Sequence, residues 1–207
     1  MMFKRMSRTS QSSAARVPAI IVVSGLPRSG TSMMMKMLSE GGLQVVTDAI
    51  RTADEDNPNG YFEFEPVKKL AEGQDAWLQG AGGKLVKVIS ALLEHLPTKY
   101  EYKVIFMERE IKEILASQQK MLVRRSEASK TTDEELEAQF REHLRATKYW
   151  LARQPNMSVM YVDYNKMMAD PAAHCQPVAD FLGAPLDVAR MLSVPNERLY
   201  RNRAARQ

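Results

Sequence analysis

The stretch from Ser24 to Ser32, Ser-Gly-Leu-Pro-Arg-Ser-Gly-Thr-Ser, combines two glycines, one arginine and four hydroxyl side chains. It follows an apolar run, 19–23, and precedes a helix-like segment, 33–40. A glycine-bounded loop between a strand and a helix points several backbone N–H groups at one spot, and the helix dipole adds partial positive charge there. A phosphate or sulfate group is the natural occupant of such a loop.

The spacing fits the phosphate-binding pattern G-x-x-x-x-G-K-[ST] with one departure, because Thr31 stands where the lysine is expected. In kinase loops that lysine reaches the β and γ phosphates. Its absence leaves Arg28 as the cation inside this loop. A guanidinium is a planar, permanently charged fork that suits a tetrahedral oxyanion, so we expect Arg28 to bind one. The alternative is an arginine paired with a surface carboxylate.

A second cation and hydroxyl follow the apolar run 102–107, YKVIFM. Arg109 comes at the end of this expected strand, and Ser117 lies eight positions later on the helix-like segment 111–122. Such a pair is common in itself. Its position after a strand, downstream of an anion-binding loop, favours a second anion site.

These side chains need elements that hold them together, and the chain alternates strand and helix patterns throughout. The expected strands are 19–23, 43–47, 84–90, 102–107 and 158–164, and the expected helices are 33–40, 65–79, 111–122, 133–151 and 171–182. This order predicts an α/β fold, a three-layer P-loop-like domain with a central parallel sheet flanked by helices. Ligands of such sheets bind at the carboxyl ends of the strands, where both anion sites would lie.

Composition narrows the class of protein. A chain of 207 residues with 44% hydrophobic residues predicts one domain, which we place at 18–207, after a basic, Ser-rich leader, 1–17, that we expect to be disordered. The net charge of +4 is too small to predict a nucleic-acid partner but suits an anionic cofactor.

Cysteine, apolar and metal-ligand patterns narrow it further. Cys175 is the single cysteine, so no intrachain disulfide can form, which favours a reducing, cytoplasmic compartment. No apolar run approaches the roughly 20 residues of a membrane span. Neither His95 nor His174 has neighbours with the spacing of a metal site, so we expect no metal.

Three segments resemble motifs of the sulfotransferase family. The loop SGLPRSGTS is similar to its 5′-phosphosulfate loop, P-[KR]-[SG]-G-[ST]-[ST], and the pair Arg109 and Ser117 is similar to its 3′-phosphate motif. The stretch 161–183, with YVDY, Pro171 and FLG, resembles the family's late Y-x-[DE]-L…P…F-L-G stretch. The resemblance covers about residues 19–203.

The resemblance implies transfer of a sulfuryl group from 3′-phosphoadenosine 5′-phosphosulfate (PAPS) to a hydroxyl or amine of a small-molecule or glycan acceptor, without a metal. It implies a binding site for the donor's 5′-phosphosulfate and another for its 3′-phosphate. The residues carried over are Arg28, Ser29, Gly30, Thr31 and Ser32 for the 5′ end, and Arg109 and Ser117 for the 3′ end. The basic C-terminal residues Arg201 and Arg203 are further candidates for the 3′-phosphate, although the cytosolic pattern R-K-G-x-x-G-x-W-K is absent.

The resemblance also bears on catalysis. Cytosolic members carry K-T-H on the strand that corresponds to 84–90, where the lysine faces the leaving group and the histidine is the base. Lys87 matches this lysine, but Ile89 stands at the position of the histidine. Lys87 is thus either catalytic or a solvated strand lysine. Because other members use a glutamate, our hypothesis for the base of an in-line displacement is Glu63, with Glu65 and Asp48 as alternatives. Capping or surface roles for these acids stay open.

Two other functions compete with this one. A P-loop kinase acting on a nucleotide or small metabolite would share the loop. This chain, however, has Thr31 in place of the kinase lysine and no obvious aspartate at a strand end to hold Mg²⁺. A catalytically silent nucleotide-binding module would explain the missing histidine, and it would bind the nucleotide without turnover.

Overall fold

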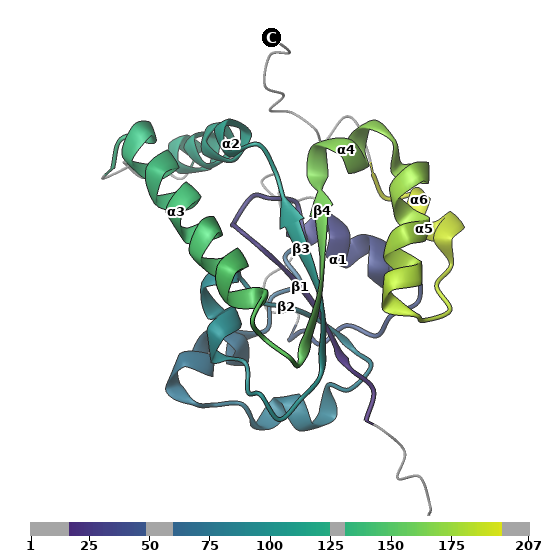
Figure 1. The fold of residues 1–207 in the computed structure, drawn as a ribbon. Helices are drawn as coiled ribbons and strands as arrows, with labels where there is room; N and C mark the ends of the chain where they lie inside the picture. Colours follow the sequence, from purple (N-terminus) through teal and green to yellow (C-terminus); the bar gives the residue numbers. More distant parts are fainter. Residues whose placement is uncertain (1–16, 49–59, 125–130, 196–207) are drawn as a thin grey trace, which may run out of the picture.

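Four parallel strands form the central sheet in the part of the chain that the structure describes. The computed structural model describes residues 17–48, 60–124 and 131–195 (Figure 1). The strands run in the order β2-β1-β3-β4, and their bounds are β1 (Ile20–Gly25), β2 (Leu85–Lys87), β3 (Tyr102–Glu108) and β4 (Met157–Asp163). The two central strands, β1 and β3, consist mostly of apolar residues. A central strand is paired on both edges and covered by helices on both faces, so its side chains are shielded from water.

Helices cover one face of this sheet, seen at the right of Figure 1. They are α1 (Thr31–Glu40), α4 (Tyr164–Ala169), α5 (Pro171–Leu182) and α6 (Val188–Leu192). Methionines of α1, including Met34 and Met37, pack with Ile105 of β3 and with Cys175 in a core from which water is excluded. The run of methionines is therefore core packing.

A second layer covers the opposite face. It contains the 3₁₀ helices η1 (Glu65–Glu72), η2 (Ala76–Gly80) and η3 (Ser90–His95), with α2 (Ile111–Arg124) and α3 (Asp133–Leu151). Leu70, Leu93 and Leu151 of these elements pack on Val104 and Phe106 of β3. The predicted α/β fold, with a parallel sheet between helical layers, is confirmed.

Three expected elements differ from the observed ones. Segment 43–47 contributes only an isolated bridge between Val45 and Leu85. The expected helix 65–79 is interrupted by Gly73, whose φ of 76° ends η1 and separates it from η2. The expected strand 84–90 shortens to β2, because the chain turns into η3 at Ser90.

Parallel register brings the predicted site residues to one edge of the sheet. Gly25 at the end of β1 pairs with Met107 of β3, and Val23 pairs with Lys87 at the end of β2. The loop after β1, Lys87 and the residue after β3, Arg109, therefore share the carboxyl edge. Among the described helices, none has both the length and the apolar character needed to cross a membrane.

Candidate functional site

The loop between β1 and α1 has a backbone that only its glycines can adopt. Gly25 and Gly30 have φ values of 146° and 99°. A Cβ on Gly25 would lie 2.6 Å from the carbonyl oxygen of Met107, and a Cβ on Gly30 would lie 2.3 Å from Cδ2 of Tyr164. The loop is thus pressed against β3 on one side and against the Tyr164 ring at the start of α4 on the other, which fixes its shape.

The loop ends in a helix N-terminus without a side-chain cap and contains a buried hydroxyl group. Gly30 is the N-cap of α1 and provides no side-chain cap, and the first turn of α1 carries no acidic residue. The Ser29 hydroxyl is buried and has no hydrogen-bond partner within the described residues. A buried donor without a partner is costly, and an oxygen of a phosphate or sulfate group would satisfy it. The loop therefore fits the group that its sequence predicts.

The two predicted anion-binding elements meet at Arg28. Its Nε donates a hydrogen bond to Oγ of Ser117 on α2 at 2.9 Å. Ser117 is buried, and Arg28 has a left-handed φ of 69°, which is uncommon outside glycine. The loop and the first half of α2 are therefore joined by this side-chain hydrogen bond.

Arg109 contacts the same loop and is held by several groups. Its Nη1 donates to the carbonyl oxygen of Arg28 at 3.1 Å, and its Nε pairs with Oε2 of Glu113 at 2.9 Å. Its Cζ lies 4.4 Å from the centre of the Tyr164 ring, within the range of a cation–π contact. Burial raises the pKa of Tyr164, while Arg109 acts in the opposite direction, so the ring stays a neutral phenol near pH 7.

Lys87 reaches the same loop from β2. Its Nζ donates to Oγ of Ser32 at 3.1 Å and to the carbonyl oxygen of Tyr61 at 2.9 Å. The structure therefore places this lysine against the first turn of α1 and against segment 60–64. Ile89, two residues later, is 43% exposed.

The three candidate carboxylates lie near one another beside segment 60–65. Oδ2 of Asp48 accepts the backbone N–H of Glu65 at 2.7 Å and so caps the start of η1. Oε1 of Glu65 lies 2.6 Å from Nζ of Lys68, whereas Oε2 of Glu63 lies 4.0 Å from it. The Glu63 backbone is anchored through its carbonyl oxygen, which accepts from Thr47 Oγ1 at 2.9 Å. Asp48 thus has a structural hydrogen bond, and of the two glutamates Glu65 lies closer to Lys68 than Glu63 does.

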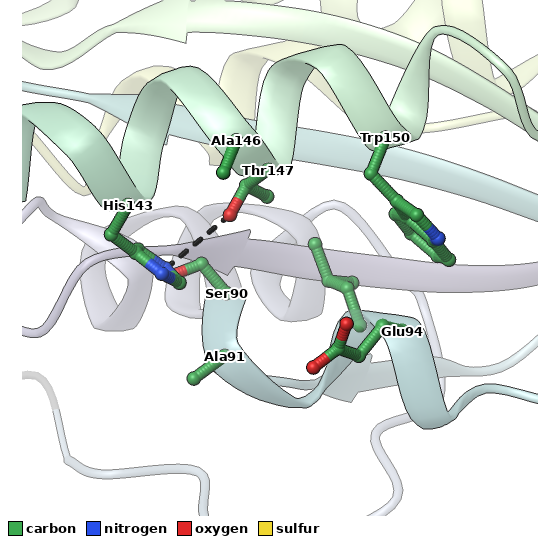
Figure 2. A pocket seen from close by; sticks show the side chains of 8 residues that line it. Ser90, Ala91, Glu94, His143, Ala146, Thr147 and Trp150 are labelled. Carbon is green, nitrogen blue, oxygen red and sulfur yellow. Dashed lines mark hydrogen bonds between the residues drawn. The ribbon is translucent and has the colours of Figure 1, made fainter.

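A pocket of about 390 Å³ lies between η3 and α3 (Figure 2). At one end Oγ of Ser90 lies 2.8 Å from Nε2 of His143, which also lies 3.4 Å from Oγ1 of Thr147; Trp150 and Glu94 line the other end. The Ser90 end adjoins the carboxyl edge of the sheet, because Val88 still hydrogen-bonds to Val23 of β1. No sequence pattern predicts a role for His143. Its contact with Thr147 could have been expected from their spacing of four on one helix, but its contact with Ser90 could not.

The remaining residues singled out from the sequence have no contact with the loop that the structure describes. Arg201 and Arg203 are outside the described residues. His95 is near Glu94, with 3.9 Å between Nε2 and a carboxylate oxygen. Within the described ranges, no group of three or more His, Cys, Asp or Glu side chains is placed to hold a metal ion.

Comparisons with known proteins found one family model and several solved structures similar to this chain. Residues 18–203 match the family model described as "Sulfotransferase domain". Mouse sulfotransferase SULT7A1, solved in complex with PAP, is similar with a TM-score of 0.56 and 16% identity, over 93% of this chain and 68% of that one. The sulfotransferase domain of the Synechococcus PCC 7002 olefin synthase is similar with a TM-score of 0.50 and 15% identity, over 95% and 87%.

The sulfotransferase domain from the curacin biosynthetic pathway is similar with a TM-score of 0.50 and 14% identity, over 86% of this chain and 77% of that one. At such identities the three structures show a shared fold. A comparison with curated proteins found no significant match.

Proposed function

The chain belongs to the sulfotransferase domain family, whose model matches residues 18–203, and from this premise we propose that it transfers a sulfuryl group from PAPS to a hydroxyl or amine. The acceptor in this proposal is a small molecule or a glycan. The mouse relative was crystallised with PAP, the nucleotide that such a transfer leaves behind. The observation that carries the proposal is the hydrogen bond from Arg28 to Ser117, which joins the loop to α2.

In this proposal the donor spans the loop between β1 and α1 and the first half of α2. Arg28, Ser29, Gly30, Thr31 and Ser32 hold its 5′-phosphosulfate, and Arg109 and Ser117 hold its 3′-phosphate. Arg201 is a further candidate for the 3′-phosphate. The donor supplies the activated sulfuryl group, and the protein supplies position and fixed positive charge, as in the related phosphoryl transfers.

The remaining roles fall to residues beside the loop. In this proposal Lys87, which donates a hydrogen bond to Ser32 of the loop, stabilises charge on the leaving oxygen. Glu63 is our candidate for the base that takes the acceptor's proton. The chain's single cysteine, Cys175, makes a reducing, cytoplasmic location part of the same proposal.

Calorimetric titration with PAP, and separately with ATP and Mg²⁺, tests the donor class. We expect PAP to bind with a micromolar Kd and ATP with Mg²⁺ not to bind. Binding of ATP with Mg²⁺ and not of PAP would instead support a kinase. Binding of PAP without turnover on any compound of an acceptor panel would support a silent nucleotide-binding module.

A further inference from the structure

The buried carboxylate of Glu113 pairs with Arg109, and none of the roles proposed so far involves it. Glu113 lies in the first turn of α2, and its side chain is 2% exposed. It pairs with Arg109, four residues earlier, whose side chain is 8% exposed. A carboxylate buried to this degree needs a charged partner, so the two side chains constrain each other.

These contacts fix the orientation of the Arg109 guanidinium. Glu113 binds its Nε, the Arg28 carbonyl oxygen binds its Nη1, and the Tyr164 ring lies against its face. A guanidinium group that is hydrogen-bonded at two of its edges and stacked on an aromatic ring is held in one orientation. Of these three groups that contact the guanidinium, only Glu113 is charged. Its exposed fraction is smaller than that of Tyr164.

The same contacts connect Arg109 to the loop. Arg28 has its left-handed φ at the position whose carbonyl oxygen accepts from Arg109. Tyr164, which lies against the guanidinium, also fills the space beside Gly30. A shift of Arg109 would therefore disturb the conformation of the loop as well as its own orientation.

We propose that Glu113 is a positioning residue for the donor. Its buried carboxylate orients the Arg109 guanidinium toward the 3′-phosphate and, through Arg109, holds Arg28 in the conformation that the loop requires. The first part of this inference, the orientation of Arg109 toward the 3′-phosphate, rests on the proposed function. The second part, the conformation of Arg28 in the loop, concerns the chain without nucleotide.

The variant Glu113→Asp tests the first part, because it keeps the negative charge and withdraws the carboxylate by about 1.5 Å, one carbon–carbon bond. Competition titrations would compare PAP with adenosine 5′-monophosphate, which lacks the 3′-phosphate. We expect the affinity for PAP to fall about tenfold or more and that for the monophosphate about threefold at most, since loss of a charge-assisted hydrogen bond affects the 3′ end most. Glu137→Asp is the matched control, because Glu137 pairs with Arg141 at the same spacing on the surface of α3.

An equal loss for both nucleotides, or no loss for PAP, would overturn the 3′-phosphate role of Glu113. Amide hydrogen exchange of residues 28–32 in the nucleotide-free protein tests the second part. We expect faster exchange there in Glu113→Asp than in the wild type or in Glu137→Asp, and unchanged exchange would overturn the effect on the loop. If the wild type fails to bind PAP, the proposed function fails, and the exchange measurement still decides whether Glu113 holds the loop.

Discussion

Three cationic side chains reach the loop between β1 and α1 from different parts of the chain. Arg28 belongs to the loop, Lys87 comes from β2, and Arg109 follows β3. Neutral oxygens of Ser117 and Ser32 accept from Arg28 and Lys87. Because these acceptors are neutral, the charges of Arg28 and Lys87 are already beside the loop before a ligand binds. An anion could replace the two hydroxyl groups without a change in the backbone, which is the kind of preorganised charge that stabilises a transition state in enzymes.

Glu63→Gln tests the proposed base. Because a positioned general base contributes about 100-fold or more, we expect turnover to fall by at least about that factor while the affinity for PAP stays within about twofold. Turnover is measured as PAP release, with the compound of an acceptor panel that reacts fastest with the wild type. Glu65→Gln is the matched control, since Glu65 already pairs with Lys68. Near wild-type turnover in Glu63→Gln would show that the base is another group.

Single residues differ in how far the sequence predicts them. Arg28 and Ser117 stand in segments with a local pattern, but the hydrogen bond that joins them was not predicted, because the sequence assigned them to opposite ends of the donor. Glu113 and His143 stand in no such pattern, and the YVDY segment that ends in Tyr164 does not indicate what this ring contacts. These contacts depend on how α2, α3 and α4 pack against elements distant in sequence. A charged residue in a helix looks the same in sequence whether it is buried or exposed.

At the scale of elements, the turn from β1 into α1 depends on Gly30. Gly30→Ala should lower the free energy of unfolding by about 2–4 kcal/mol, since its backbone is left-handed and its Cβ would meet the Tyr164 ring. We also expect binding of PAP to be lost, because the ring and the loop cannot keep their positions together. Denaturant unfolding and calorimetry measure the two effects.

Gly80→Ala is the control for that change. A Cβ on Gly80 meets no atom within 4 Å, and its φ lies outside the left-handed region. We expect both stability and PAP binding to stay near the wild type. A Gly30→Ala protein as stable as this control would contradict the steric role of Tyr164.

Local signals decide which elements the sequence can predict. α3 begins after Thr132, whose side chain and that of Glu135 form a capping box, and its bounds were predicted from the stripe of apolar residues. Segment 65–79 has a similar stripe but forms two 3₁₀ helices, because Gly73 interrupts it. Periodicity alone does not distinguish these cases, since it reports burial of one face and not the continuity of hydrogen bonds.

At the scale of the whole molecule, buried phenols make stability depend on alkaline pH. Burial raises the pKa of Tyr102 and of Tyr164 above the ordinary value. Above about pH 10 the unfolded chain then binds fewer protons than the folded chain, so the free energy of unfolding falls as pH rises; below that pH the phenols contribute no slope. Urea midpoints measured from about pH 7 to 11, with phenolate absorbance as a second signal, should show this decline.

Tyr102→Phe isolates one of these contributions. It removes the hydrogen bond to the Pro97 carbonyl oxygen, so we expect about 1 kcal/mol less stability near pH 7 but a shallower decline above pH 10. Tyr149→Phe, at an exposed position, should leave the slope unchanged. An identical slope in Tyr102→Phe and the wild type would show that this phenol does not titrate differently in the folded chain.

The single thiol of the chain has a practical use. Cys175 is a buried residue of α5, and burial raises the pKa of its thiol, so little reactive thiolate is present in the native state. A cysteine introduced at the exposed Ala116, beside Ser117, would be the one site open to a maleimide dye. The fluorescence of that dye would report nucleotide arrival at α2 directly, before any acceptor has been identified.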